Sequence, residues 1–258
     1  MPRFAANLSM MFNEWSFLDR FAAAADAGFK AVEFLFPYEF SPEDVADRLK
    51  AAGLTQALFN LPPGDWAAGE RGIAALPGRQ EEFRASVARA LDYALATGVK
   101  RLHMMAGLAP SDSTEAGTLY RESIRFACAA LAPHGVDLVL EPINRRDMPG
   151  YFMNDFGMAA ALIAELGLPN LKLQYDIYHR QILHGDVTRS LEALLPITGH
   201  VQVASVPLRN EPGTGELDDF RIFALLDALG YDGFVGCEYR PAGATLDGLG
   251  WMGKTTLR

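Results

Sequence analysis

The alternation of short apolar segments with amphipathic segments of helical periodicity is the feature that most constrains this fold. The apolar segments predict eight strands, at residues 4–11, 31–36, 55–60, 101–106, 137–143, 171–177, 200–205 and 233–239. Such nearly continuous apolar runs are typical of parallel strands that are covered on both faces. Their mean spacing, about 32 residues, is close to that of one strand–helix unit in a (β/α)8 barrel.

We therefore expect an α/β fold, a single (β/α)8 TIM barrel that spans residues 1–258 as one domain. The alternative is a doubly wound open sheet, which usually has fewer strands and carries a G-x-G-x-x-G motif after its first strand. No such motif follows the first predicted strand, and no break in composition or short repeat marks a domain boundary. Residues 61–79, rich in Gly and Pro, form the longest stretch without periodicity, and such loops tend to be functional or mobile.

The charge balance and the two cysteines narrow the choice of partners and compartment. The chain has 23 Lys and Arg against 32 Asp and Glu, a net charge of −9, whereas nucleic-acid-binding proteins usually carry the opposite bias. No apolar run reaches the roughly 18 residues of a membrane span, and residues 1–12 lack the features of a signal peptide. Cys128 and Cys237 lie far apart in apolar segments, which favours buried free thiols in a reducing compartment. We expect a cytoplasmic protein without a nucleic-acid or membrane partner.

Polar side chains interrupt the apolar runs where four of the predicted strands end: Glu141, Asp176, Gln202 and Glu238. In a TIM barrel the carboxyl ends of the strands carry the chemistry. Apolar residues flank each of the four, so alternation along the strand sends each polar side chain to the opposite face, where the four converge if that face is the interior. Buried carboxylates without a counter-charge repel one another, and a divalent cation relieves that repulsion. Hard oxygen ligands suit Mg²⁺ or Mn²⁺.

A purely structural interpretation stays open beside the metal site, because acids are common in this chain and strand ends of other barrels use them in salt bridges. His179, three residues after Asp176, is either a substrate contact or an ordinary loop histidine. Arg71, in the long loop, and Arg209, after the seventh strand, are either contacts for an anionic substrate or solvated surface residues. His103, within the fourth strand, fits a core histidine better than a ligand.

The sequence resembles the hydroxypyruvate isomerase family, within the xylose-isomerase-like barrel superfamily, over essentially its whole length. The segments that carry the resemblance are residues 4–10, 32–38, 64–72, 141–144, 174–179, 200–202, 211–216 and 236–239. It implies catalytic roles for Glu141 and Glu238 and a substrate contact for His179. The metal positions that it implies are Glu141, Asp176, Gln202 and Glu238.

The resemblance implies an aldose–ketose isomerisation that converts hydroxypyruvate, a small anionic 2-keto acid, into 2-hydroxy-3-oxopropanoate with a divalent metal and no organic cofactor. Residues 64–72 and 141–144 look like hydroxypyruvate isomerases, whereas residues 1–12 and 204–207 look equally like 2-oxo-tetronate isomerases. Some hydroxypyruvate isomerases carry Asp and His where this chain has Ser205 and Leu208. A ketose 3-epimerase, a DNA repair nuclease and a non-catalytic sugar-acid-binding protein are the other functions we weigh. The outer helices of the barrel leave room for a homo-oligomer.

Overall fold

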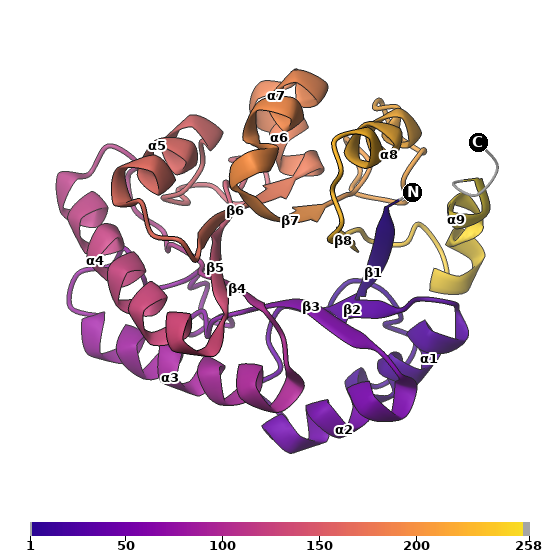
Figure 1. Cartoon of the computed structure of the whole chain (residues 1–258), viewed down its shortest axis with the longest axis horizontal. Helices are drawn as coiled ribbons and strands as arrows, with labels where there is room; N and C mark the ends of the chain where they lie inside the picture. Colours follow the sequence, from indigo (N-terminus) through magenta and orange to yellow (C-terminus); the bar gives the residue numbers. More distant parts are fainter. Residues whose placement is uncertain (1, 255–258) are drawn as a thin grey trace.

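The computed structural model describes residues 2–254, in which eight parallel strands close into a barrel with helices around its outside (Figure 1). The strands follow one another in sequence order, and β8 pairs with β1. They are β1 Arg3–Asn7, β2 Ala31–Glu33, β3 Thr55–Asn60, β4 Arg101–His103, β5 Asp137–Leu140, β6 Leu171–Asp176, β7 Thr198–Gln202 and β8 Phe234–Cys237. The predicted (β/α)8 barrel is confirmed. Residues 1 and 255–258 of the predicted domain lie outside the described residues.

The helices connect successive strands and cover the outside of the barrel (Figure 1). They are α1 Arg20–Asp26, α2 Pro42–Ala52, α3 Gln80–Thr97, α4 Thr114–Leu131, α5 Phe156–Leu166, α6 Ile177–His184, α7 Val187–Leu194, α8 Asp219–Ala228 and α9 Gly250–Lys254. Local chemistry sets their ends: the Ser41 side chain caps α2, and Gly53 closes it in the left-handed region at φ 63°. Within residues 2–254, no helix combines the length and the apolar character needed to cross a bilayer.

Most of the paired strands are shorter than the apolar runs that predict them. The ladder of β1 stops at Asn7 and that of β2 at Glu33, although both apolar runs continue. Leu8, Met11 and Phe34, just beyond these ends, are fully or almost fully buried. Backbone pairing stops where neighbouring strands diverge into loops, while the loop residues still pack onto the core. Hydrophobicity therefore marks burial here and overshoots the end of most ladders.

The barrel interior is unusually polar toward the carboxyl ends of the strands. TIM-barrel interiors are dominated by Val, Ile and Leu. Here Asn7, Glu33, His103, Gln174 and His200 are all at least 98 % buried. An apolar core of strand and helix side chains surrounds this interior, and it contains both cysteines, which are free and buried as predicted. A polar interior at this end of a barrel is where a ligand site is expected.

Candidate metal and substrate site

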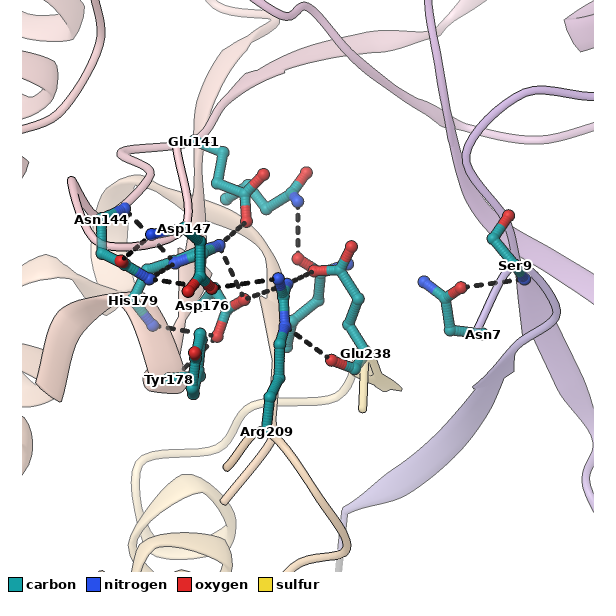
Figure 2. Close-up of polar contacts among 12 residues, drawn as sticks. Asn7, Ser9, Glu141, Asn144, Asp147, Asp176, Tyr178, His179, Arg209 and Glu238 are labelled. Atoms are coloured by element: carbon teal, nitrogen blue, oxygen red, sulfur yellow. Dashed lines mark hydrogen bonds and ion pairs between the residues drawn. The ribbon is translucent and has the colours of Figure 1, made fainter. Parts of the chain in front are cut away.

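The predicted strand-end acids converge at the carboxyl end of the barrel (Figure 2). Glu141 directly follows β5, Asp176 ends β6, and Glu238 directly follows β8. Together with His179 they each place one ligand-capable atom within 4.8 Å of the others, and all four side chains are buried. Two carboxylate oxygens of this group, Glu141 Oε1 and Asp176 Oδ2, have no hydrogen-bond partner among the described residues. A buried carboxylate oxygen without a hydrogen-bond partner is open to a ligand.

Burial raises the pKa of all three carboxyl groups. It raises the pKa of Asp176 to about 6 and that of Glu238 to about 8. The pKa of Glu141 is raised by burial first and by the neighbouring Glu238 second. Without a bound cation, these groups therefore hold protons at pH values where ordinary carboxyl groups are ionised.

Asp176 is the N-cap residue of α6, and this role fixes both its own side chain and the position of His179 in the first turn. Its Oδ1 caps α6 by accepting hydrogen bonds from the backbone N–H groups of Tyr178, at 2.7 Å, and His179, at 3.4 Å. The His179 side chain therefore leaves the first turn of α6, where Nε2 lies 3.6 Å from Asp176 Oδ2 and 3.7 Å from Glu141 Oε1. Burial lowers the pKa of His179 well below its usual value. The structure places His179 in a helix, so it is not the loop histidine of the second interpretation.

Arg209 is the cation that contacts this group of side chains. Its Nη2 lies 3.0 Å from Glu238 Oε2 and 3.8 Å from Asp176 Oδ2, and its guanidinium stacks 4.8 Å above the Tyr178 ring centroid. Nη1 lies 3.5 Å from Asp147 Oδ2 (Figure 2). The structure therefore brings Arg209 to the predicted site, where its guanidinium group is paired with carboxylates of the protein.

Arg71 contacts its own loop rather than this group of side chains. Its guanidinium stacks over the Trp66 ring at 3.9 Å, and Nη1 donates hydrogen bonds to the carbonyl oxygens of Trp66 and Glu70. A cleft of about 720 Å³, whose lining includes Ser9, Leu35 and Arg240, opens on the same end of the barrel. These three residues follow β1, β2 and β8, so the cleft lies among the same loops as the site. The substrate role of Arg71 stays a prediction.

Gln202 belongs to a second buried polar network, centred on Glu33. The Glu33 carboxylate accepts hydrogen bonds from Asn7 Nδ2 at 3.0 Å and Gln202 Nε2 at 2.8 Å, and His200 Nε2 lies 2.6 Å from it. Gln202 pairs with Asp176 in the ladder between β6 and β7, so the network adjoins the metal candidates. The amide oxygen of Gln202 accepts from Gln174 Nε2 at 2.6 Å and has a second lone pair for another contact.

Sequence reasoning assigned no role to Glu33, Asn144 or Gln174. Glu33 carries the same signal as the predicted acids, since it is an acid between apolar residues at the end of a strand. Asn144 lies three residues after Glu141 in a segment that the resemblance already marks. Gln174 precedes Asp176 by two positions on β6 and therefore shares its face of the sheet. Strand alternation could have found Gln174 and Glu33, while Asn144 acts through loop geometry.

A match to a family model decides the family. The model for the xylose isomerase-like TIM barrel matches residues 21–255. The chain belongs to the xylose isomerase-like TIM barrel family. Members of known name include the 2-oxo-tetronate isomerase of Cupriavidus necator, 56% identical over 98% of both chains, and the hydroxypyruvate isomerase of Escherichia coli (strain K12), 45% identical over 98% of both. The predicted resemblance is confirmed, and these full-length relatives identify the chain as an isomerase.

Solved structures of the family agree with the fold. A protein from Brucella melitensis described as an AP endonuclease, family 2, is 51% identical, with a TM-score of 0.96 over 98% of this chain and 99% of that one. A D-allulose 3-epimerase from Methylomonas sp. has a TM-score of 0.79 over 99% of both chains at 21% identity, which supports the fold alone.

Proposed function

We propose that this chain is a metal-dependent isomerase that interconverts hydroxypyruvate and 2-hydroxy-3-oxopropanoate. The observation that carries the proposal is the buried group of Glu141, Asp176, His179 and Glu238, which holds two carboxylate oxygens without hydrogen-bond partners among the described residues. A sugar-acid-binding protein needs only donors for its ligand, whereas this group also presents acids suited to proton transfer.

The donor set fits a divalent cation. Glu141, Asp176 and Glu238 would hold it with carboxylate oxygens, and Gln202 would add an amide oxygen beside Asp176. Such hard ligands suit Mg²⁺ or Mn²⁺, and neither cysteine belongs to the set. When bound, the cation supplies positive charge where negative charge develops on the substrate oxygens.

Glu141 and Glu238 perform the proton transfers in this proposal. One glutamate removes a proton from C3 of hydroxypyruvate and the other returns a proton to C2, while the hydroxyl proton moves from the C3 oxygen to the C2 oxygen. The carbonyl group thereby moves from C2 to C3, and no electrons leave the substrate, so an organic cofactor is not required.

An acidic protein needs local positive or hydrogen-donating groups to hold an anionic 2-keto acid. His179 and Arg209 lie at the group of acids, and Arg71 lies on the long loop after β3. We assign all three to substrate binding. The net charge of −9 gives no general attraction for the substrate, so these contacts must supply it.

A 2-oxo-tetronate is the second candidate substrate, because the relative of that name is 56% identical. It differs from hydroxypyruvate by a CH₂OH group on C3, and the same proton transfer applies to it. Ser205 and Leu208 bear on the choice: the Ser205 hydroxyl is buried and donates to the Glu211 carbonyl, while the Leu208 side chain is 74 % exposed.

We place the reaction in the cytoplasm, consistent with the buried free thiols, and a homo-oligomer stays a prediction.

The decisive experiment assays chelator-treated protein with added Mg²⁺ or Mn²⁺ in D₂O. Hydroxypyruvate, a 2-oxo-tetronate and a free ketose are the substrates, and NMR identifies the product and the deuterated carbon. We expect metal-dependent conversion of hydroxypyruvate with deuterium at C2, and a Glu238→Gln control without turnover. Epimerisation of the ketose alone, or binding without solvent-proton exchange, would contradict the proposal. A higher kcat/KM for the tetronate would select the second substrate.

A further inference from the structure

The side-chain amide of Asn144 is held in one orientation by the loop that follows β5. Its Oδ1 accepts hydrogen bonds from the backbone N–H groups of Arg146 and Asp147, both at 2.9 Å. Two N–H donors can face only the oxygen of an amide, so these bonds fix which end is oxygen and which is nitrogen. The Nδ2 group must therefore point the other way. It lies 2.7 Å from His179 Nδ1 and 3.3 Å from Asp147 Oδ2 (Figure 2).

Both groups of Asn144 that face the His179 ring are donors. Besides Nδ2, the backbone N–H of Asn144 points at the same ring atom, Nδ1, at 3.4 Å. A ring nitrogen that faces two N–H donors cannot carry a hydrogen of its own. The hydrogen of the neutral ring must then be on Nε2. This is the nitrogen that faces Glu141 and Asp176 at 3.7 and 3.6 Å.

We propose that Asn144 is a positioning residue that holds His179 in the Nε2–H tautomer, which makes His179 a hydrogen-bond donor in the site and excludes it from the ligands of a cation. By distance alone, His179 belongs with the three acids as a candidate ligand. A nitrogen that carries hydrogen has no lone pair for a metal, so this tautomer separates the roles. The acids are left to hold the cation, and His179 donates to an oxygen of the substrate. The last step rests on the proposed function, whereas the tautomer does not.

The test observes the His179 hydrogen directly, by long-range ¹H–¹⁵N NMR of metal-free protein labelled with ¹⁵N-histidine. The chain has five histidines, and a His179→Gln variant assigns the signals. The informative variant is N144D/D147N, which keeps the net charge and the acceptor for the two backbone N–H groups but presents an acceptor to Nδ1. The matched control is D147N, which keeps the Asn144 amide. N144A, which removes the Nδ2 donor together with the Oδ1 acceptor, serves if N144D/D147N does not fold.

We expect wild type and D147N to carry the hydrogen on Nε2 and N144D/D147N to carry one on Nδ1. N144A is expected to lose the single-tautomer pattern. Hydrogen on Nδ1 in wild type, or an unchanged pattern in both Asn144 variants, would overturn the inference. In the isomerase assay at pH 8, the KM for hydroxypyruvate should rise about 10- to 100-fold in N144D/D147N relative to D147N. Absence of isomerase activity in wild type would refute the proposed function and leave the NMR result to decide the tautomer.

Discussion

Two buried carboxylate groups lie side by side in this barrel, and they differ in how their oxygens are satisfied. Glu33 is fully buried, yet its carboxylate faces Asn7, His200 and Gln202 at 2.6 to 3.0 Å. Glu141 and Asp176 are almost as deeply buried, yet each keeps an oxygen without a hydrogen-bond partner among the described residues. Burial is therefore common to both groups, and hydrogen bonding separates them.

The difference indicates which group is built for a ligand. A buried carboxylate that accepts several hydrogen bonds stabilises the fold that supplies them. A buried carboxylate with an open oxygen costs stability until something binds it. We infer that the Glu33 network supports the barrel and orients Gln202, while the acids around Asp176 are kept for a cation and a substrate.

The largest effect is expected at the two proposed acid–base residues. Glu141→Gln and Glu238→Gln should each lower kcat for hydroxypyruvate by a factor of about 10³ or more, because an amide cannot move the proton. In chelated protein the same variants should be as stable as wild type or more so, since burial disfavours the charged form of each acid. Steady-state kinetics and urea unfolding measure the two effects. Near-normal activity in either variant with Mn²⁺ present would contradict the mechanism.

The opposite pattern is expected at Glu33. Glu33→Gln should lower the free energy of unfolding by about 3 kcal/mol, because donors that surround a buried acceptor lose its charge. Gln56 provides the matched control, since it is buried in the same barrel and its amide has no hydrogen-bond partner among the described residues. Gln56→Met should therefore change stability little. Equal effects at Glu33 and Gln56 in urea unfolding would remove the distinction between the two groups.

Cation binding at the acids around Asp176 should stabilise the folded protein, and it should do so more strongly at pH 8 than at pH 6. At a Mn²⁺ concentration 100 times Kd, the free energy of unfolding should rise by about 2.7 kcal/mol. The pKa of Glu238 is raised to about 8 and that of Asp176 to about 6, so at pH 6 protons occupy the groups that the cation needs. Thermal unfolding with and without chelator measures this, with Asp176→Asn as control. A stabilisation that grows as the pH falls would be opposite in sign.

The smallest effect is expected at Arg71, whose contacts lie in its own loop. Arg71→Ala should raise the KM for hydroxypyruvate about fivefold and leave kcat within twofold, as for one partly exposed charged contact. Arg89→Ala is the control, because Arg89 also stacks on an aromatic ring, that of Tyr38, and carries the same charge. An equal change of KM in both variants would show that Arg71 acts through overall charge.

The sequence predicts the barrel and three of its buried acids, but it misses the role of Glu33 for a physical reason. The alternation of apolar segments predicts the barrel, and the strand-end pattern predicts the acids at Glu141, Asp176 and Glu238. Glu33 shows the same pattern, but its partners lie as far away as β7. It reaches them across Gly236, where a Cβ would lie 2.1 Å from Glu33 Oε2. Such long-range contacts depend on barrel closure, which no local pattern contains.

Asp176 shows how a helix end prepares a binding site before any ligand arrives. One of its oxygens is committed to the cap of α6, so rotation of the carboxylate would break hydrogen bonds to the backbone. The other oxygen is thereby aimed at the acids opposite without further adjustment. A ligand that binds there meets a side chain whose rotamer freedom was already lost when the helix formed. The entropic cost of ordering the Asp176 side chain is therefore part of folding and not of binding. This preorganisation raises the affinity for whatever binds there.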